Sequence, residues 1–470
     1  MRQYNTKELV KKWGALLEAE GETAIKDPYK KRVTAILFEN MQQELSSAAA
    51  FGSSQNTGFG GRQVLNEAGI PANFMGASSS TAGAGGIDTF DPIMISLVRR
   101  AAPNMVAYDI LGVQPLTGPT GLVFALRPTY STQSGAQTWY NEVNTAFSTV
   151  VSGANVAGQK HVGSLPGNST ATANLAETGL YNFATGMSTA QGEALGTDSN
   201  TAWPEMSFTI DKHTVTAVER NLKGEYTIQI AQDLKAIHGL DADQELSTII
   251  STELLAEINR EVVRTVNFTA KQGSQENVTN AGIFNLDTDS NGRWSVEKFK
   301  GLMFHIDREC NRIAKETRRG KGNILICSSD IASCLQAAGV LDYAPAIQNA
   351  LVGEVDDTGN TFVGVLNGRI KVFIDPYADA ILAGTPGLNY FTVGYKGPTA
   401  YDAGLFYCPY VPLQRVTAVD PQSFHPKIGY LTRYGMTANP FAQGLAATNQ
   451  GQILKDSNVY YRRSIVTNIM

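Results

Sequence analysis

The stretch DADQELSTIISTELLAEINREVVRTVN, residues 241–267, carries the most regular pattern in the chain. Apolar residues recur there at every fourth position, at Leu246, Ile250, Leu254, Ile258, Val262 and Val266, and the stripe is widened by Ile249, Leu255 and Val263. This spacing places the apolar side chains on one face of an α-helix. Asp241 or Asp243 can cap the N-terminus by accepting a backbone N–H. The pattern therefore predicts a spine helix on the order of 35 Å long.

The sequence after this stretch alternates between helical and extended patterns. A helix is predicted from about 296 to 317, with one apolar face made of Phe299, Leu302, Met303, Ile306, Cys310 and Ile313. A strand (NILICSS), a helix (DIASCLQAAGV) and three further strands (RIKVFIDP, NYFTVGYKG and GLFYCPYVPL) follow. Such an alternation is typical of an α+β domain.

The sequence before the spine helix is mostly extended. Residues 206–234 alternate well enough for paired strands, and extended pieces at 111–113 and 122–126 flank a turn at 117–121, which predicts a long hairpin. Asp91-Pro92 is a suitable start for a short helix. Residues 144–204 are rich in Thr, Ser, Gly, Asn and Ala, which fits a small β insertion or a mobile loop region. Both interpretations stay open.

Residues 1–67 differ in character from the rest of the chain. Apolar residues at helical spacing predict two helices there, one through Leu9, Val10, Trp13, Leu16 and Leu17, the other through Val33, Ile36, Leu37, Met41 and Leu45. Asp27-Pro28 breaks the pattern between them. Residues 46–62, SSAAAFGSSQNTGFGGR, have the composition of a linker. The segment is therefore predicted to be a separable, charged, helical appendage.

The bulk composition excludes several classes of protein. The 470 residues are 43% apolar, and 38 basic and 43 acidic groups give a net charge of −5, without a broad electrostatic footprint for nucleic acid or an anionic membrane. The first ten residues lack the apolar core of a secretory signal, and no run of about eighteen apolar residues could span a bilayer. We expect a protein made and kept in the cytosol.

The four cysteines form no CxxC pair, which favours buried free thiols.

Residues 287–292, DTDSNG, match the first half of a calcium-binding EF-hand loop. The twelfth position of that loop is Lys298, however, and Glu297 comes one residue early. A structural turn with a helix cap is favoured over a cation site.

The basic run 318–321 follows a predicted helix C-terminus, where cations are favoured in any case. The five histidines are dispersed and no catalytic motif is present. No enzyme activity, metal or cofactor is expected.

Three long blocks of sequence resemble a known family. Residues 86–127 (GIDTFDPIMISLVRRAAPNMVAYDILGVQPLTGPTGLVFALR), 292–314 and 404–442 look like the major capsid protein of T-even-like tailed bacteriophages of the myovirus type. The resemblance covers most of the chain beyond residue 68. It implies the Hong Kong 97-type α+β capsid fold, divided as follows: an N-arm at 68–110, an E-loop at 111–143, a small β insertion domain at 144–204, a peripheral domain at 205–317 with the spine helix, an axial domain at 318–435, and a return to the peripheral domain at 436–470.

The resemblance also implies a function without catalytic residues. Hexamers of the chain would build the icosahedral or prolate head shell, which encloses double-stranded DNA without sequence-specific contacts. The implied partners are neighbouring capsomers, the capsid vertex protein, an internal scaffold, the prohead protease, the portal and decoration proteins. The chain would be made in the host cytoplasm and end in the virion. Two alternatives stay open: the vertex (pentamer) protein of the same phages, and an unrelated soluble enzyme.

The stretch QVLNEAGI, residues 63–70, is predicted to be a maturation cleavage site. The prohead protease of the resembled family cuts after an apolar-x-Glu tripeptide, and Leu65-Asn66-Glu67 fits it. Four other tripeptides also fit: 16–18, 37–39, 175–177 and 255–257. Leu65, unlike the tripeptide in the spine helix, lies in a predicted linker and is followed by the small residues Ala68 and Gly69. We expect the cut between Glu67 and Ala68, which removes residues 1–67; a plain loop is the alternative.

Overall fold

The computed structural model describes eleven longer stretches of the chain and a few short pieces between them: 6–17, 27–52, 105–135, 203–290, 292–339, 341–343, 362–378, 389–399, 401–420, 425–443 and 451–469. The predicted helix at Asp91-Pro92 and most of 144–204 lie outside the described residues. Helix α5 (Thr189–Glu193) belongs to the described part of that range. The fold is α+β, as predicted.

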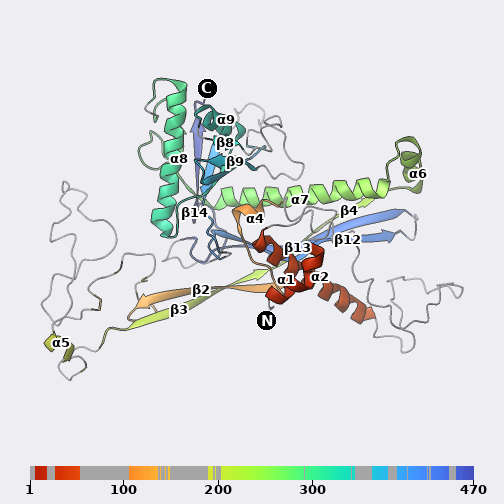
Figure 1. Cartoon of the computed structure of the whole chain (residues 1–470), viewed down its shortest axis with the longest axis horizontal. Helices are drawn as coiled ribbons and strands as arrows, with labels where there is room; N and C mark the ends of the chain where they lie inside the picture. Colours follow the sequence, from red (N-terminus) through yellow and green to blue (C-terminus); the bar gives the residue numbers. More distant parts are fainter. Residues whose placement is uncertain are drawn as a thin grey trace.

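The predicted spine helix is confirmed as α7 (Ala242–Thr269). Asp241 caps it by accepting a hydrogen bond from the Asp243 N–H at 3.1 Å. The buried side chains follow the predicted stripe: Ile250, Leu254, Ile258, Val262 and Val266. At the outer end of α7 lies the short helix α6 (Ile228–Ile237), which Figure 1 shows at the far tip of the molecule.

A four-stranded sheet lies along α7 (Figure 1). Its order is β1-β12-β13-β4, where β1 is Gly112–Val113, β12 is Leu405–Val419, β13 is Pro426–Ala438 and β4 is Val218–Glu225. β13 pairs with both of its neighbours in the antiparallel direction, whereas β1 runs parallel to β12. Helix α4 (Ala107–Ile110) leads directly into β1, which is the edge strand of this sheet.

An eight-stranded sheet forms the other part of the core. Its order is β5-β14-β11-β7-β10-β9-β8, with β6 also paired to β14. The strands are β5 (Ala270–Gln272), β6 (Ile283–Asn285), β7 (Ile324–Cys327), β8 (Leu341–Tyr343), β9 (Phe362–Leu366), β10 (Ile370–Ile374), β11 (Tyr390–Gly394) and β14 (Asn458–Thr467). Helices α8 (Ser295–Thr317) and α9 (Ser329–Ala337) accompany it. The helices and strands predicted between 296 and 413 are thus confirmed.

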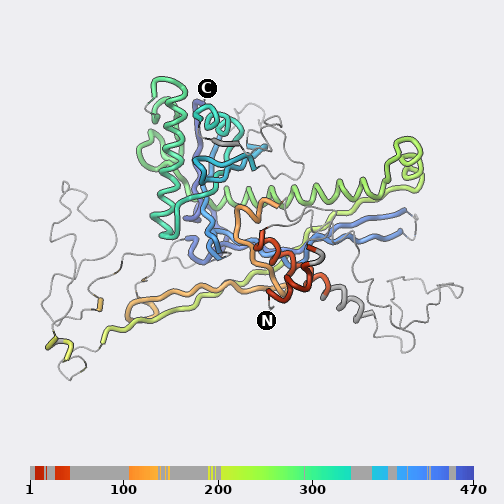
Figure 2. Tube along the Cα trace, in the orientation of Figure 1, coloured from red at the N-terminus to blue at the C-terminus, as the bar shows by residue number. Residues whose placement is uncertain are grey.

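The predicted hairpin within 111–143 is wrong. β2 (Thr120–Tyr130) pairs in the antiparallel direction with β3 (Met206–Thr216), and the two strands form a long ribbon that extends away from the sheets (Figure 2). The extended piece at 111–113 instead joins β12 as β1. β3 and β4 do not pair with each other either, although residues 206–234 were predicted to form paired strands. The turn residues between the two extended pieces favour pairing of those pieces with each other. Here each piece pairs instead with a longer strand that lies far away in the sequence.

The strand pairing also groups residues differently from the predicted domain ranges. The range 318–435 assigns β12 and most of β13 to the axial domain, yet both strands belong to the sheet that lies along α7. The range 205–317 assigns α8 to the peripheral domain, yet α8 packs on β11 and β14 of the eight-stranded sheet. The predicted domain boundaries stay predictions, because both sheets combine strands from distant parts of the chain.

The two predicted N-terminal helices are confirmed as α1 (Thr6–Leu17) and α2 (Pro28–Gly52). The linker predicted at 46–62 begins too early, because α2 continues to Gly52 through a run of three alanines, the strongest helix former. Helix α2 packs on the body of the chain, and the separability of the two helices stays a prediction. α2 contacts β12, and its Val33 and Leu37 belong to the main hydrophobic core.

Candidate assembly surfaces

One face of the β2–β3 ribbon is apolar and exposed; we call it the ribbon face. Its side chains come from alternate positions of both strands, and their exposed fractions are Leu122 38%, Phe124 60%, Leu126 44%, Met206 60%, Phe208 57% and Ile210 60%. Leu126 lies directly opposite Ile210 in the pairing register. An isolated two-stranded ribbon is at best marginally stable in water, and a contiguous exposed apolar surface marks an interaction site.

The opposite face of the ribbon is anchored to the body. Val123 and Val215 pack in one apolar cluster with Phe406 of β12. Arg127 is 6% exposed, and its Nε lies 2.6 Å from the Asp211 carboxylate across the ribbon. The ribbon therefore has an inner face that fixes its base and an outer face that no described residue covers.

A second exposed apolar surface lies at the outer end of α7. It consists of Ile230 and Ile237 on α6, Leu240 in the connection, and Ile249 on α7. No residue of α6 is buried, although the helix carries three isoleucines. A group of exposed apolar residues such as this marks a candidate interaction surface.

Helix α4 is the point where α7 and the two sheets meet. The Asn259 side chain of α7 accepts a hydrogen bond from the Val106 N–H at 3.0 Å. Lys396, which follows β11, donates its ammonium group to the Tyr108 carbonyl, and Tyr461 of β14 donates to the Ile110 carbonyl at 3.3 Å. Burial lowers the pKa of Lys396 to about 8, and the nearby Asp109 carboxylate opposes this shift. These three contacts fix the direction in which the chain enters β1.

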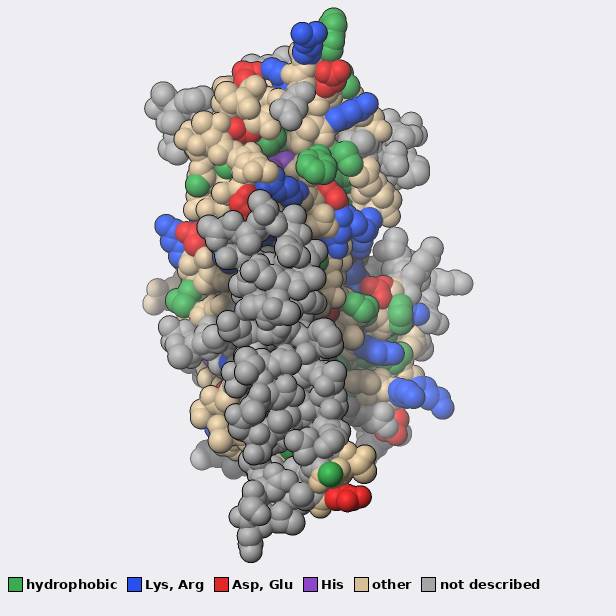
Figure 3. All heavy atoms as spheres, turned by 90° about the vertical axis from the view of Figure 1, so that its left-hand side faces the viewer, with side chains coloured by type: hydrophobic (Ala, Val, Ile, Leu, Met, Phe, Trp, Pro, Cys, Tyr) green, Lys and Arg blue, Asp and Glu red, His purple; other side chains and the backbone are tan. Residues whose placement is uncertain are grey.

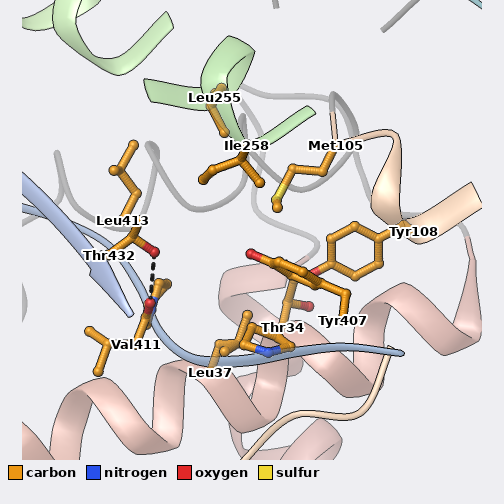
Figure 4. A pocket seen from close by; sticks show the side chains of 12 residues that line it. Thr34, Leu37, Met105, Tyr108, Leu255, Ile258, Tyr407, Val411, Leu413 and Thr432 are labelled. Atoms are coloured by element: carbon orange, nitrogen blue, oxygen red, sulfur yellow. Dashed lines mark hydrogen bonds between the residues drawn. The ribbon is translucent and has the colours of Figure 1, made fainter. Parts of the chain in front are cut away.

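Helix α2 lies against this junction. Its Tyr29 hydroxyl contacts the backbone of Val113, and its Asn40 side chain contacts the backbone of Leu116 and Tyr410. A small cavity of about 40 Å³ remains between α2 and the body, lined by Thr34, Leu37, Met105, Tyr108, Leu255, Ile258, Tyr407, Pro409, Val411, Pro412, Leu413 and Thr432 (Figure 4). Sequence periodicity did not indicate these contacts, because Tyr29 and Asn40 lie outside the apolar stripe that predicted the helix.

The EF-hand-like segment forms a hydrogen-bonded turn, which is the structure favoured by its sequence. The Asp289 carboxylate accepts hydrogen bonds from the backbone amides of Thr279 and Asn285, at 3.0 and 2.9 Å. Lys298 pairs with Asp287, and Glu297 caps α8 by accepting from the Arg293 N–H at 2.9 Å. Within the described ranges, no group of three or more His, Cys, Asp or Glu side chains could hold a metal ion.

The predicted buried thiols are confirmed: Cys310, Cys327, Cys334 and Cys408 are all buried, and none of the four is in a disulfide. Burial raises the pKa of Cys310 to about 12, that of Cys334 to about 11 and that of Cys408 to about 12. Their reactive thiolate forms are therefore scarce near neutral pH.

The basic run at 318–321 takes part in local ion pairs at the end of α8. Lys321 lies 2.6 Å from the Asp307 carboxylate, and Arg319 lies 3.5 Å from that of Asp402. In the described part of the face shown in Figure 3, basic side chains are interspersed with acidic and hydrophobic ones. Among the described residues, none of the helices combines the length and apolar character that crossing a bilayer requires.

The predicted cleavage site, Leu65, Glu67 and Ala68, lies outside the described residues. Two competing tripeptides lie inside helices: Leu37 in α2 is 4% exposed, and Leu255 in α7 is 8% exposed. A protease binds its substrate as an extended segment, so these two positions are closed as long as the helices stay folded.

Comparisons with known proteins point to one family. The family model described as Major capsid protein Gp23 matches residues 87–466. The major capsid protein of Salmonella phage ViI is 36% identical over 99% of this chain and 98% of its own length, and that of Enterobacteria phage T4 is 35% identical over 98% and 99%. The capsid vertex protein of Enterobacteria phage T4 is 28% identical over 55% of this chain and 58% of its own length.

Among solved structures, the capsid of Myoviridae phage XM1 covers 76% of this chain and 90% of its own, with a TM-score of 0.37 and 8% identity. The family assignment comes from the sequence comparisons. The family model spans most of the chain, and two relatives that are at least 35% identical match nearly its full length. This chain therefore belongs to the Gp23 family of phage major capsid proteins.

Proposed function

We propose that copies of this chain assemble into hexamers that build the icosahedral or prolate head shell around the phage double-stranded DNA. Family membership confirms the major capsid protein and the α+β capsid fold predicted from the sequence, and makes the chain a structural protein of the virion capsid. The assembly proposal rests on the ribbon face, because six large apolar side chains are exposed there in the isolated chain. A neighbouring copy supplies the cover, as oligomer interfaces bury apolar surface.

We assign the parts of the Hong Kong 97-type fold to the observed elements. The β2–β3 ribbon acts as the E-loop, and residues between its strands form the insertion domain. α7 with the four-stranded sheet forms the peripheral domain, and the eight-stranded sheet with α8 and α9 forms the axial domain. Residues 68–110 serve as the N-arm. The ribbon extends away from both sheets, which supports its role in joining one copy to the next (Figure 1).

The shell encloses its DNA without reading the sequence. Specific DNA recognition needs a concentrated basic surface with side chains that reach base edges. The net charge of −5 and the interspersed charges in Figure 3 support a container rather than a DNA-binding protein.

The assembly proposal is tested by making the ribbon face polar. Phe124→Ser together with Phe208→Ser removes two of its most exposed aromatic side chains and alters no described core contact. We expect soluble chain with an unchanged thermal unfolding midpoint, and no shells in electron micrographs of cells that also supply the other head proteins. Lys212→Ser, directly opposite Phe124 on the same face, is the control and should assemble. Normal shells from the double variant would refute the role of the ribbon face.

We further propose that the prohead protease cuts between Glu67 and Ala68, after an internal scaffold has guided assembly. The remaining partners are the portal, the vertex protein and decoration proteins. The burial of Leu37 and Leu255 within helices supports Leu65-Asn66-Glu67 over two of its competitors.

In mass spectra of mature particles the chain should begin at Ala68. Glu67→Ala should arrest particles before expansion, whereas Glu177→Ala, which removes the competing tripeptide at 175–177, should mature. Mature subunits that still begin near Met1 would exclude this cut.

The vertex protein is the alternative role within the same phages. Similarity to the vertex protein of Enterobacteria phage T4 covers 55% of this chain, against 98% for the major capsid protein of that phage, and this difference supports the hexamer. Counting subunits per particle distinguishes the two roles, because vertices need far fewer copies than the faces of the shell.

A further inference from the structure

Helix α2 is packed on two opposite sides. On one side it meets α1, through a cluster that contains Leu9, Trp13, Phe38 and Met41. On the other side Val33 and Leu37 enter the main core of the body. Both sides are closely covered, so α2 joins α1 to the body as a middle layer.

Polar contacts fix the position of α2 on the body. Its Tyr29 hydroxyl accepts a hydrogen bond from the Val113 N–H at 3.1 Å and donates one to the Val113 carbonyl. Val113 lies in β1, and the outer backbone groups of an edge strand are open to pairing with other chains unless something covers them. Burial raises the pKa of Tyr29 to about 12, which keeps its hydroxyl a donor.

Asn40 closes the other end of the same edge. Its side chain is 3% exposed, and its amide nitrogen donates to the Leu116 carbonyl at 2.7 Å and to the Tyr410 carbonyl at 3.1 Å. One amide thus bridges the chain after β1 and strand β12. Without α2, both carbonyls would lose this donor, which is costly for buried polar groups.

The interface nevertheless contains a gap. The cavity of about 40 Å³ lies between Thr34 and Leu37 of α2 and the body side chains Tyr108, Tyr407 and Ile258 (Figure 4). Protein interiors are normally filled to crystal-like density, and each void forfeits contacts along its lining. α2 is therefore positioned by specific hydrogen bonds, and the cavity leaves part of its contact with the body unfilled.

We propose that α2 is a helical ligand of the body that stays bound after the chain is cut, so that dissociation of α1 and α2, and not the cut itself, uncovers the edge of β1. The inference rests on the proposed cleavage for the place of the cut. There, water adds across the Glu67–Ala68 peptide bond and leaves a carboxylate on Glu67 and an amine on Ala68. That bond lies well beyond the end of α2 at Gly52, so hydrolysis breaks no contact of α2. It only converts an intramolecular contact into an intermolecular one.

The test uses the full chain with a recognition sequence for an unrelated protease placed within residues 54–61. After complete cutting at micromolar concentration, native mass spectrometry and size-exclusion chromatography should find the N-terminal fragment still bound. Tyr29→Phe and Asn40→Ala should each speed dissociation at least tenfold. Arg32→Ala, on an exposed position of α2, should not change it. Thr34→Ile, which extends into the cavity, should slow it.

Immediate loss of the wild-type fragment would overturn the inference. So would dissociation of both Tyr29→Phe and Asn40→Ala at the rate of Arg32→Ala. Circular dichroism before cutting shows whether each variant has folded, and two independent contact variants keep the test decisive if one has not. Because the cut is engineered, the result does not depend on the prohead protease. Failure of Glu67→Ala to arrest maturation would exclude the natural cut while leaving the measured binding intact.

Discussion

His305 shows how a single residue of the α8 core responds to pH. Its side chain is 4% exposed, its Nε2 lies 2.7 Å from the Ser274 hydroxyl, and its ring stacks on Phe284 with centroids 4.4 Å apart. The pKa of His305 is lowered to about 4, mainly by burial and next by the positive charge of Arg308. Arg312 adds to this shift and Asp289 opposes it. The imidazole is therefore neutral in the folded chain at physiological pH.

We predict that this histidine makes the fold sensitive to mild acid. Its pKa is about 4 in the folded chain and about 6.5 in an unfolded one, so between these values only the unfolded state takes up the proton. The contribution of His305 to stability is constant above about pH 6.5. It falls as the pH drops towards 4, by up to about 1.4 kcal/mol per pH unit. Urea unfolding at a series of pH values measures the slope.

The control for this prediction removes the titrating group. His305→Gln should lower the free energy of unfolding at every pH, because it disturbs the Ser274 contact, but should flatten the slope between pH 6.5 and 4. His238→Gln, at an exposed position, should keep the wild-type slope. An unchanged slope in His305→Gln would assign the acid sensitivity to other groups.

Among the secondary-structure elements, α7 tests most directly how burial stabilises the fold. Ile258 is 3% exposed and faces the core, whereas Ile249 on the same helix is 62% exposed. Ile258→Asp would bury a carboxylate without a partner, and we expect a loss of several kcal/mol and insoluble chain. Ile249→Asp, the matched control, should stay soluble. The measurement compares the soluble fractions of the two variants after expression. If the Ile258→Asp chain is soluble, the apolar stripe of α7 is not buried.

The elements differ in how far the sequence could predict them. α7 was predictable within two residues because its stripe and its Asp241 cap are local signals. The partner of β2 could not be predicted. Its partner strand β3 begins only after residue 205, and no residue near Thr120 indicates that pairing. The extension of α2 to Gly52 was missed because serine and glycine outweighed the alanine run in the interpretation of residues 46–62.

The candidate surfaces were predictable to a smaller extent. Alternation in β3 indicated that one face of that strand would be apolar, but exposure of the ribbon face depends on what the rest of the chain fails to cover. The contacts of Tyr29 and Asn40 depend on backbone carbonyls and amides brought close by folding, and side-chain periodicity carries no information about them. The cleavage tripeptide remains a prediction, as its residues lie outside the described ranges.

At the scale of the whole molecule, the β2–β3 ribbon connects the segment between these two strands to the rest of the chain. Tyr130 pairs with Met206, and the Ser131 N–H donates to the Glu205 carbonyl at 2.9 Å, so the ribbon closes before the intervening segment begins. Replacing residues 132–204 by Asn-Gly should form a two-residue hairpin across Ser131 and Glu205. We predict that the thermal unfolding midpoint of the body changes by no more than a few degrees, as measured by circular dichroism.

Replacing the same residues by Val-Val is the control, because β-branched residues are disfavoured in the positive-φ positions of this turn. This variant should unfold at a lower temperature than the Asn-Gly variant. Loss of the cooperative unfolding transition in the Asn-Gly variant would show instead that the removed segment contributes to the core.

The four buried cysteines make the shell suitable for site-specific labelling. Their thiols are shielded by the core, and the three with raised pKa values offer almost no thiolate to an electrophile in neutral buffer. A maleimide dye added to native subunits should therefore find little background reactivity, and one cysteine introduced at a surface position would carry nearly all of the fluorophore. Pairs of dyes, one on the ribbon and one beside α6, could then report changes in subunit geometry as distance changes by energy transfer, without removing any native thiol.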